Sequence, residues 1–163
     1  QLLANAGMLE DKHVSWIPSY GPEMRGGTAN CSVVISDREI SSPIVTEPTI
    51  LVALNMPSLE RFEGTVKTGG TIVFNSSLCK PPSREDVQVL GVPANEIAEN
   101  LGNSKIVNMV IVGALAEKTG LVGMDTIVKA LERVLPENRH SLIPLNKSAL
   151  EAGAKTASVS VDS

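Results

Sequence analysis

The chain has few aromatic residues and no excess of positive charge. Aromatics make up 2% of its 163 residues, so its core must be built from aliphatic side chains. Fourteen basic residues against 18 acidic ones give a formal charge of −4, and no stretch concentrates lysine or arginine as a nucleic-acid-binding surface does. The uncharged stretches are far shorter than the roughly 20 apolar residues of a membrane-spanning helix. These shortages predict a soluble, cytoplasmic protein that binds neither nucleic acid nor membrane.

Cysteine is equally scarce. Cys31 and Cys79 are far apart, with no CxxC motif and no histidine nearby, which excludes the usual spacing of a zinc or iron–sulfur site. Two reduced thiols are expected rather than a disulfide. His13 and His140 lack the partners of a catalytic triad, and phosphate-binding glycine motifs are missing. We therefore expect no catalytic residue and no metal ligand on this chain.

The first two thirds of the sequence alternate between strand and helix patterns. Residues 13–17 and 28–36 are predicted strands, and 49–55 and 71–77 are apolar, β-branched runs typical of strands covered on both faces. Between these two runs, the spacing of residues 57–70 predicts a helix that begins at Pro57 and ends at Gly69. Residues 87–93 form another predicted strand. This alternation is typical of parallel βαβ units.

Helices are predicted in the remainder. Residues 94–102 and 108–120 carry helical patterns that end in glycine, the next helix is predicted to be capped by Asp125, and a last one to begin at Asn146 and end at Gly153. Residues 1–7 read as a helix ended by Gly7, so we expect a first strand and its glycine-rich turn to be missing from this chain. The predicted fold is a single three-layer α/β domain over residues 1–163, with a mostly parallel sheet and a helical C-terminal half.

Small polar residues lie at the ends of three predicted strands, and the first group is Ser19 with Tyr20, after the strand that ends at Ile17. Because ligands of parallel α/β sheets bind beyond the carboxyl ends of the strands, we expect a crevice lined by Asn55, Ser58, Asn75, Ser76 and Ser77. Hydroxyls and amides at such places also cap helices and close turns. That structural role remains the competing interpretation for each of the five.

The connection between the first two strands has the most unusual composition. Residues 16–30, "WIPSYGPEMRGGTAN", hold the only tryptophan and the only tyrosine of the chain. Arg25 sits next to glycines that permit close backbone approach, so it can present its donors to a phosphate or carboxylate. A solvated arginine in a surface turn is the alternative. Long ordered loops, however, tend to be functional.

Three long stretches together resemble the gamma subunit of the 2-oxoacid:ferredoxin oxidoreductases. They are "WIPSYGPEMRGGTANCSVVIS", "LVALNMPSLERFEGTVKTGGTIVFNSSL" and "VPANEIAENLGNSKIVNMVIVGAL", and the later "LIPLNKSALEAG" is also similar. The similarity covers nearly the whole chain in the expected order. It is strongest to the 2-oxoglutarate and branched-chain 2-oxoacid enzymes.

The resemblance implies an accessory subunit. Enzymes of this family decarboxylate a 2-oxoacid oxidatively, pass the electrons through iron–sulfur clusters to ferredoxin and release an acyl-CoA. It implies that other subunits hold thiamine diphosphate, magnesium and the clusters, and that this subunit helps form the coenzyme A side of the active site. The residues expected to face coenzyme A or a partner subunit are Tyr20, Gly21, Glu23, Met24, Arg25, Gly26, Gly27, Thr28 and Asn30.

Two alternatives stay open. The chain can be a purely structural scaffold, which contacts partner subunits through apolar surface around Trp16, Met24 and Met56 without touching substrate. It can also be a free-standing nucleotide- or flavin-binding α/β domain, since fold alone does not fix function.

Overall fold

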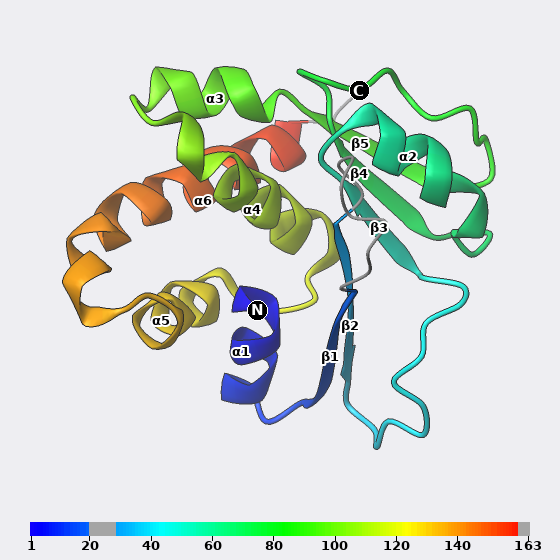
Figure 1. Ribbon diagram of the computed structural model, residues 1–163, viewed down its shortest axis with the longest axis horizontal. Coiled ribbons are helices and arrows are strands. Elements are labelled where there is room, and N and C mark those ends of the chain that lie inside the picture. Colours follow the sequence, from blue (N-terminus) through cyan, green and yellow to red (C-terminus); the bar gives the residue numbers. More distant parts are fainter. Residues whose placement is uncertain (20–28, 160–163) are drawn as a thin grey trace. The chain divides into compact units, whose positions relative to one another are not determined.

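The computed structural model describes residues 1–19 and 29–159 (Figure 1). They fall into two compact units, each built from two segments of the chain: Gln1–Val45 with Gly120–Pro144, and Thr46–Thr119 with Leu145–Ser163. We call the first the ribbon unit and the second the sheet unit, and describe each by itself. That the whole chain acts as one domain stays a prediction. In the described ranges, no helix combines the length and the apolarity needed to cross a membrane.

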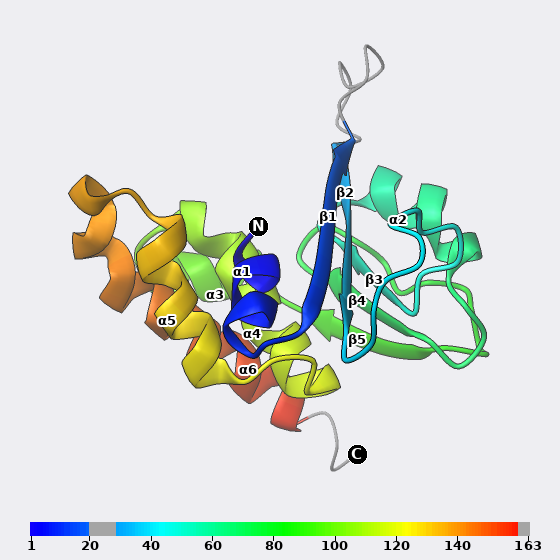
Figure 2. The same cartoon turned by 90° about the horizontal axis from the view of Figure 1, so that it is seen from below.

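The ribbon unit consists of a helix pair and a two-stranded antiparallel ribbon. Helix α1 (Leu2–Leu9) contacts both α5 (Met124–Val134) and the ribbon, and a 3-10 segment, η4 (Glu137–Leu142), follows α5. Strands β1 (His13–Ser19) and β2 (Asn30–Ser36) run side by side (Figure 2), with Trp16 opposite Val33 and Ser19 opposite Asn30. The predicted strand 13–17 is confirmed and continues to Ser19.

The sequence predicted that Gly7 ends the first helix, and this prediction is wrong. The helix continues to Leu9, and Gly7 lies on its buried face. A β-carbon on Gly7 would lie 2.9 Å from Val14 Cγ2 and 3.2 Å from Ile35 Cγ2. The glycine is therefore needed because α1 packs closely on paired residues of the ribbon, a long-range reason that local stop signals do not reveal.

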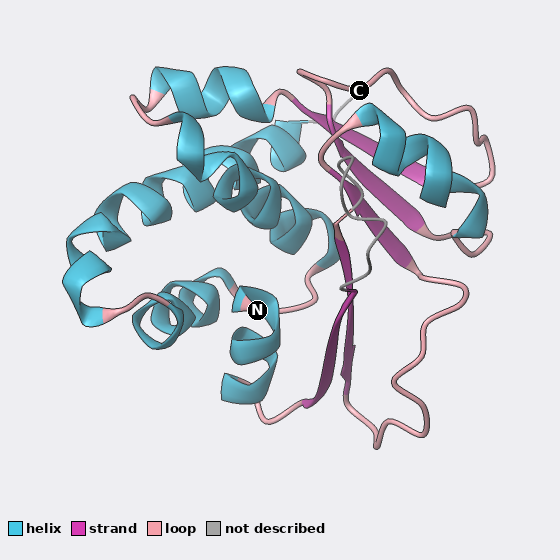
Figure 3. Ribbon diagram, in the orientation of Figure 1, coloured by secondary structure: helices cyan, strands magenta, loops and turns pink. Residues whose placement is uncertain are grey.

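The sheet unit is built around three parallel strands in the order β3–β4–β5. These are β3 (Ile50–Ala53), β4 (Thr71–Asn75) and β5 (Gln88–Val92). Helix α2 (Met56–Phe62) and the 3-10 turn η2 (Glu63–Thr65) connect β3 to β4. After β5, every regular element described is helical (Figure 3): α3 (Ala94–Asn100), η3 (Ser104–Ile106), α4 (Val107–Thr119), then α5, η4 and α6 (Ile143–Val159). The prediction of a helical C-terminal half is confirmed.

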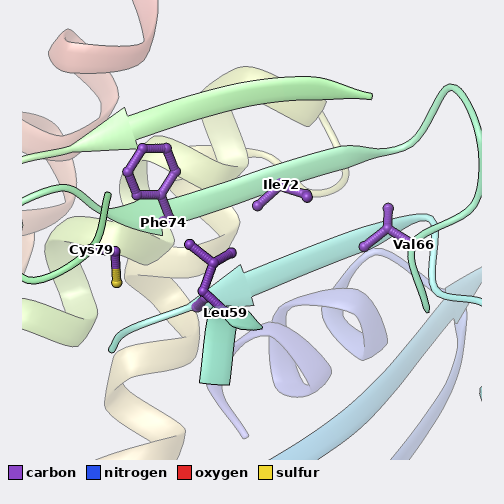
Figure 4. Close-up of a cluster of buried hydrophobic side chains, with 6 residues drawn as sticks. Leu59, Val66, Ile72, Phe74 and Cys79 are labelled. Atoms are coloured by element: carbon purple, nitrogen blue, oxygen red, sulfur yellow. The ribbon is translucent and has the colours of Figure 1, made fainter. Parts of the chain in front are cut away.

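Strand β4 is the centre of the sheet unit. Four of its five residues are buried, and alternate side chains of a strand point to opposite faces. Ile72 and Phe74 join Leu59 of α2 in a buried cluster on one face (Figure 4), while Val73 is fully buried on the other, where α4 contacts β4. The predicted coverage of both faces is confirmed for this strand.

The predicted mostly parallel sheet is only partly correct. Parallel pairing is confined to β3, β4 and β5, whereas β1 and β2 form a separate antiparallel pair. The physical reason lies in the length of the connection: Ser19 ends β1 and Asn30 begins β2, and a connection this short is below the roughly dozen residues that a parallel crossover needs.

Helices α4 and α6 cross at glycines. A β-carbon on Gly113 would overlap the backbone carbonyl of Leu150, and one on Gly153 would overlap the carbonyl of Val110. Helix α6 continues to Val159, so Gly153 does not end it as predicted. Asn146 lies inside this helix rather than capping it. The two glycines let the helix backbones touch.

Candidate functional site

The polar residues at the carboxyl ends of β3 and β4 are organised by Asn75. Its side chain is 1% exposed. Asn75 Nδ2 donates to Leu54 O at 3.4 Å and to Asn95 Oδ1 at 2.8 Å, and Asn75 Oδ1 accepts from the backbone N–H of Ser77 and of Ala94, each at 3.3 Å. The side chain thus joins the exit of β3, the turn after β4 and the start of α3.

Helix α3 is capped from another part of the chain. Its own N-cap residue, Pro93, makes no side-chain cap hydrogen bond. Instead Asn75 Oδ1 accepts from Ala94 N, and Ser77 Oγ accepts from Asn95 N at 3.2 Å. These bonds satisfy two of the first N–H groups of a helix, which otherwise lack partners. Sequence reasoning missed Asn95, because its role depends on a turn some 18 residues earlier in the chain.

Asn55 caps helix α2. Its Oδ1 accepts from the backbone N–H of Ser58 at 3.0 Å, with Pro57 in the first turn. Ser76 is exposed, and its backbone N–H continues the pairing with β5 by donating to Val92 O at 2.8 Å. The structure thus brings Asn75 and Ser77 together with Asn95, and gives Asn55 and Ser58 a helix cap of their own. Among the five crevice residues, Ser76 presents the exposed side chain.

Of the residues predicted to face coenzyme A or a partner, only Asn30 is among those that the structure describes. Tyr20, Gly21, Glu23, Met24, Arg25, Gly26, Gly27 and Thr28 fall outside the described residues. Asn30 is described: it opens β2, is exposed, and pairs with Ser19. The loop therefore leaves and rejoins the ribbon at one cross-strand pair.

The ribbon exposes large apolar side chains on both of its faces. Trp16 is 41% and Ile17 is 40% exposed. As neighbours in one strand they point to opposite faces. Helix α1 covers the Val14–Ile35 end of one face, which leaves Trp16 nearer the loop. Tryptophan is enriched at surfaces that contact another protein, whereas a single exposed isoleucine is common on any protein surface.

Arg84 and Asp86 of the sheet unit form an ion pair that the sequence patterns did not predict. Arg84 Nε and Nη2 donate to the two carboxylate oxygens of Asp86, each at 2.6 Å. Arg84 Nη1 also donates to the carbonyls of Glu63 and Val66, at 2.8 and 3.0 Å. Thr68 Oγ1 donates to Asp86 Oδ2 at 2.9 Å. These partners lie up to 21 residues from Arg84, so no local sequence signal announces them.

The same contacts shift the pKa of both groups. The guanidinium of Arg84 and the hydroxyl of Thr68 hold the pKa of Asp86 well below its ordinary value, because both donate to the ionised carboxylate. The hydrogen bond to Asp86 raises the pKa of Arg84 in return. A bidentate, charge-assisted pair of this kind fixes the geometry of the loop that carries it.

Helix α5 is also capped from a distance. The predicted cap, Asp125, lies within its first turn, and Gly123 is the N-cap. Glu10 Oε1 accepts from Gly123 N at 2.7 Å. The pKa of Glu10 is lowered, first by this backbone donor and then by Thr126 and Lys12.

Throughout residues 1–19 and 29–159, no three His, Cys, Asp or Glu side chains gather in a metal-binding group. Cys31 is exposed in the ribbon unit, and Cys79 is buried in the sheet unit, where burial raises the pKa of its thiol. Two cysteines are too few for an iron–sulfur cluster, which takes four protein ligands.

Two known proteins are similar in sequence to most of this chain. The chain is 38% identical over 156 residues to ketoisovalerate oxidoreductase subunit VorA of Methanothermobacter marburgensis, a match that covers 95% of this chain but only 32% of that protein. It is 35% identical over 142 residues to 2-oxoglutarate synthase subunit KorC of Methanothermobacter thermautotrophicus, covering 83% of this chain and 74% of that one. The chain thus spans about a third of the first relative and most of the second.

A solved structure has the same architecture. The keto/oxoacid ferredoxin oxidoreductase gamma subunit of Geobacter sulfurreducens superposes with a TM-score of 0.83 at 26% identity, over 97% of this chain and 88% of that one. The sequence pattern of the family described as pyruvate ferredoxin/flavodoxin oxidoreductase matches residues 1–156. The chain therefore belongs to the pyruvate ferredoxin/flavodoxin oxidoreductase family, in which it corresponds to the gamma subunit.

Proposed function

We propose that this chain works as the gamma subunit of a cytoplasmic, multi-subunit 2-oxoacid:ferredoxin oxidoreductase. In the proposed reaction a 2-oxoacid loses carbon dioxide, its acyl group passes to coenzyme A, and two electrons pass to ferredoxin. The family match over residues 1–156 carries this proposal. Two relatives, named for ketoisovalerate and 2-oxoglutarate, favour a branched-chain or dicarboxylic 2-oxoacid as substrate.

The reactive groups would come from partner subunits. Thiamine diphosphate, its magnesium ion and the iron–sulfur clusters would be held there, since the two cysteines of this chain cannot ligate a cluster. The lengths of the relatives support such an assembly: about a third of VorA matches this chain, whereas KorC is a chain of similar size. We expect a domain that is part of a longer chain in one relative and a separate chain in another to pack against the same neighbours in both.

The tip of the ribbon is the proposed contact with those neighbours. Trp16 and Ile17 expose apolar surface on the two faces of the ribbon, and the pair Ser19–Asn30 holds the two ends of the following loop together. In the proposal, Trp16 packs against a partner subunit, and the loop of residues 20–30, with Arg25, borders the coenzyme A side of the active site. An arginine there would offer paired donors to a phosphate of coenzyme A.

Assembly is tested through the single tryptophan. The chain labelled with 5-fluorotryptophan gives one fluorine resonance, from Trp16, because the chain has no other tryptophan. We expect that resonance to shift when unlabelled partner subunits are added. An unchanged resonance in a complex that has demonstrably assembled would show that Trp16 is not at an interface.

The coenzyme A role is tested separately with Arg25→Ala in the assembled complex. The expected result is a raised Michaelis constant for coenzyme A with an unchanged Michaelis constant for the 2-oxoacid. Arg38→Ala is the matched control, because Arg38 is exposed beyond the other end of β2. If Arg25→Ala behaves like the control while the Trp16 resonance still shifts on assembly, the scaffold alternative is the correct one.

A further inference from the structure

The sheet unit has a second polar feature, a pocket at the opposite ends of its strands from Asn55 and Asn75. The pocket has a volume of about 380 Å³ and is lined where β3 and β4 begin, by Thr49 and Thr71, by the turn of Lys67, Gly69 and Gly70, and by Lys118 near the end of α4. All of these residues belong to the sheet unit. The volume falls in the range of small-molecule sites, roughly 300–1,000 Å³.

The charge of this pocket has one sign. Its lining includes two lysines, Lys67 and Lys118, and no carboxylate. Neither lysine belongs to an ion pair in the part of the chain that the structure describes. The protein as a whole carries a charge of −4. The two lysines in this pocket therefore do not simply reflect an excess of basic residues in the sequence. Concave sites lined by one sign of charge attract counter-ions, because low-dielectric walls focus the field.

A neighbouring carboxylate is already neutralised. Asp86 accepts from Thr68 in the pocket wall, but Arg84 holds both of its oxygens at 2.6 Å. Asp86 therefore does not compete with an incoming anion for the two lysines. Asp86 thus contacts a residue of the pocket lining, but its charge is balanced by Arg84, and the lining itself carries only the two lysine charges.

The turn that carries Lys67 is held in place before any ligand arrives. Lys67 N donates to Pro48 O at 3.0 Å, and Gly69 N donates to Asp86 O at 2.8 Å. Gly69 has a φ of 80°, which favours glycine, and a β-carbon on Gly70 would lie 2.7 Å from Thr49 O. Because Gly70 N and Thr71 N also donate to carbonyls, of Lys67 and Thr49, the turn fixes the position of Lys67 and leaves ligand contacts to side chains.

From the unpaired lysines, the glycine turn and the pocket's size together, we infer that this pocket binds a small molecule through a phosphate group that carries two or more negative charges. The Lys67 and Lys118 ammonium groups supply the charge, and the Thr49 and Thr71 hydroxyls supply neutral donors. The inference concerns the amino ends of the strands and does not depend on the proposed gamma-subunit role.

The experiment uses the full chain, isotopically labelled, and pyrophosphate as the probe at constant ionic strength. We expect saturable changes in the amide resonances of Lys67, Gly69 and Thr71. The double variant Lys67→Gln/Lys118→Gln should weaken binding at least tenfold. Lys80→Gln, at an exposed lysine of the same unit, is the matched control and should leave the affinity unchanged.

Two outcomes would overturn the inference that this pocket is an anion-binding site. One is the absence of saturable change in the chain that carries both lysines. The other is equal weakening by Lys80→Gln, since that would show general charge screening rather than a site. Citrate provides a further comparison: if it binds as tightly as pyrophosphate, the assignment to phosphate is wrong. Thermal unfolding of each variant separates loss of binding from loss of the fold.

Discussion

Gly153 of α6 lies directly against the backbone carbonyl of Val110 in α4, with no room between them for a side chain. An alanine at an ordinary helical position stabilises a helix by about 1 kcal/mol relative to glycine. At this crossing the added methyl group must push the helices apart. The packing cost therefore exceeds the gain in helix propensity.

We predict that Gly153→Ala lowers the free energy of unfolding by about 2 kcal/mol, as overpacking in a close contact does. Urea titration followed by circular dichroism measures it. The control is Gly64→Ala, where a new β-carbon meets nothing within 4 Å and a change within about 0.5 kcal/mol is expected. Equal stability of the two variants would mean that the helices do not touch at Gly153.

Asn75 should be the most costly polar residue of the sheet unit to replace. Asn75→Ala leaves the N–H groups of Ser77 and Ala94 without their acceptor, and we expect a loss of about 3 kcal/mol, at the upper end for buried unsatisfied groups. Hydrogen exchange at Ala94 should accelerate at the same time. Ser76→Ala, at the adjacent exposed position, should leave stability and exchange nearly unchanged.

The Arg84–Asp86 pair should make stability depend on acid pH. The pKa of Asp86 is lower in the folded chain than in the unfolded one, so its contribution is fully present above about pH 5 and is lost as the pH falls through the folded pKa. Asp86→Asn should therefore lower the urea midpoint at pH 7, and the difference from the unchanged chain should shrink at pH 3.

A suitable control for this pH profile is Glu60→Gln, at an exposed position of α2. It removes one negative charge without touching the pair. If its difference from the unchanged chain follows the same course with pH, the effect belongs to net charge rather than to the Arg84–Asp86 contact.

Glu10 is predicted to stabilise the ribbon unit by capping α5. Glu10→Ala removes the acceptor of Gly123 N and should cost about 1 kcal/mol, as the loss of an N-cap does. Glu10→Gln keeps an acceptor and should retain most of that stability at pH 7. Hydrogen exchange at Gly123 distinguishes the two variants, and equal protection in both would contradict the cap.

Local patterns predicted most helices and strands of this chain. Helix α4 and the glycine that ends it followed from residues 108–120 alone: Gly120 has a φ of 61°, as a helix-ending glycine should. Gly7 and Gly153 looked the same in sequence. Their roles depend on Ile35 and Val110, which local spacing does not bring near, so the predicted helix ends were wrong.

The polar edge of the sheet was predicted in position but not in organisation. Asn75 is the last residue of β4, and Ser77 follows it in the next turn. Their hydrogen bonds to Ala94 and Asn95 depend on the parallel pairing of β4 with β5, which composition does not specify. The contacts of Arg84 were not predicted for the same reason. The carbonyls that Arg84 contacts belong to the segment after α2, which is distant from Arg84 in sequence.

The interrupted path of the chain has a practical consequence. Residues 120–144 of the ribbon unit are inserted between two segments that together form the sheet unit. Neither unit is therefore encoded by one uninterrupted stretch, and trimming the gene at either border would split a hydrophobic core instead of isolating a module. Fragments prepared by cutting near Gly120 would need to be co-expressed and recombined as complementing halves.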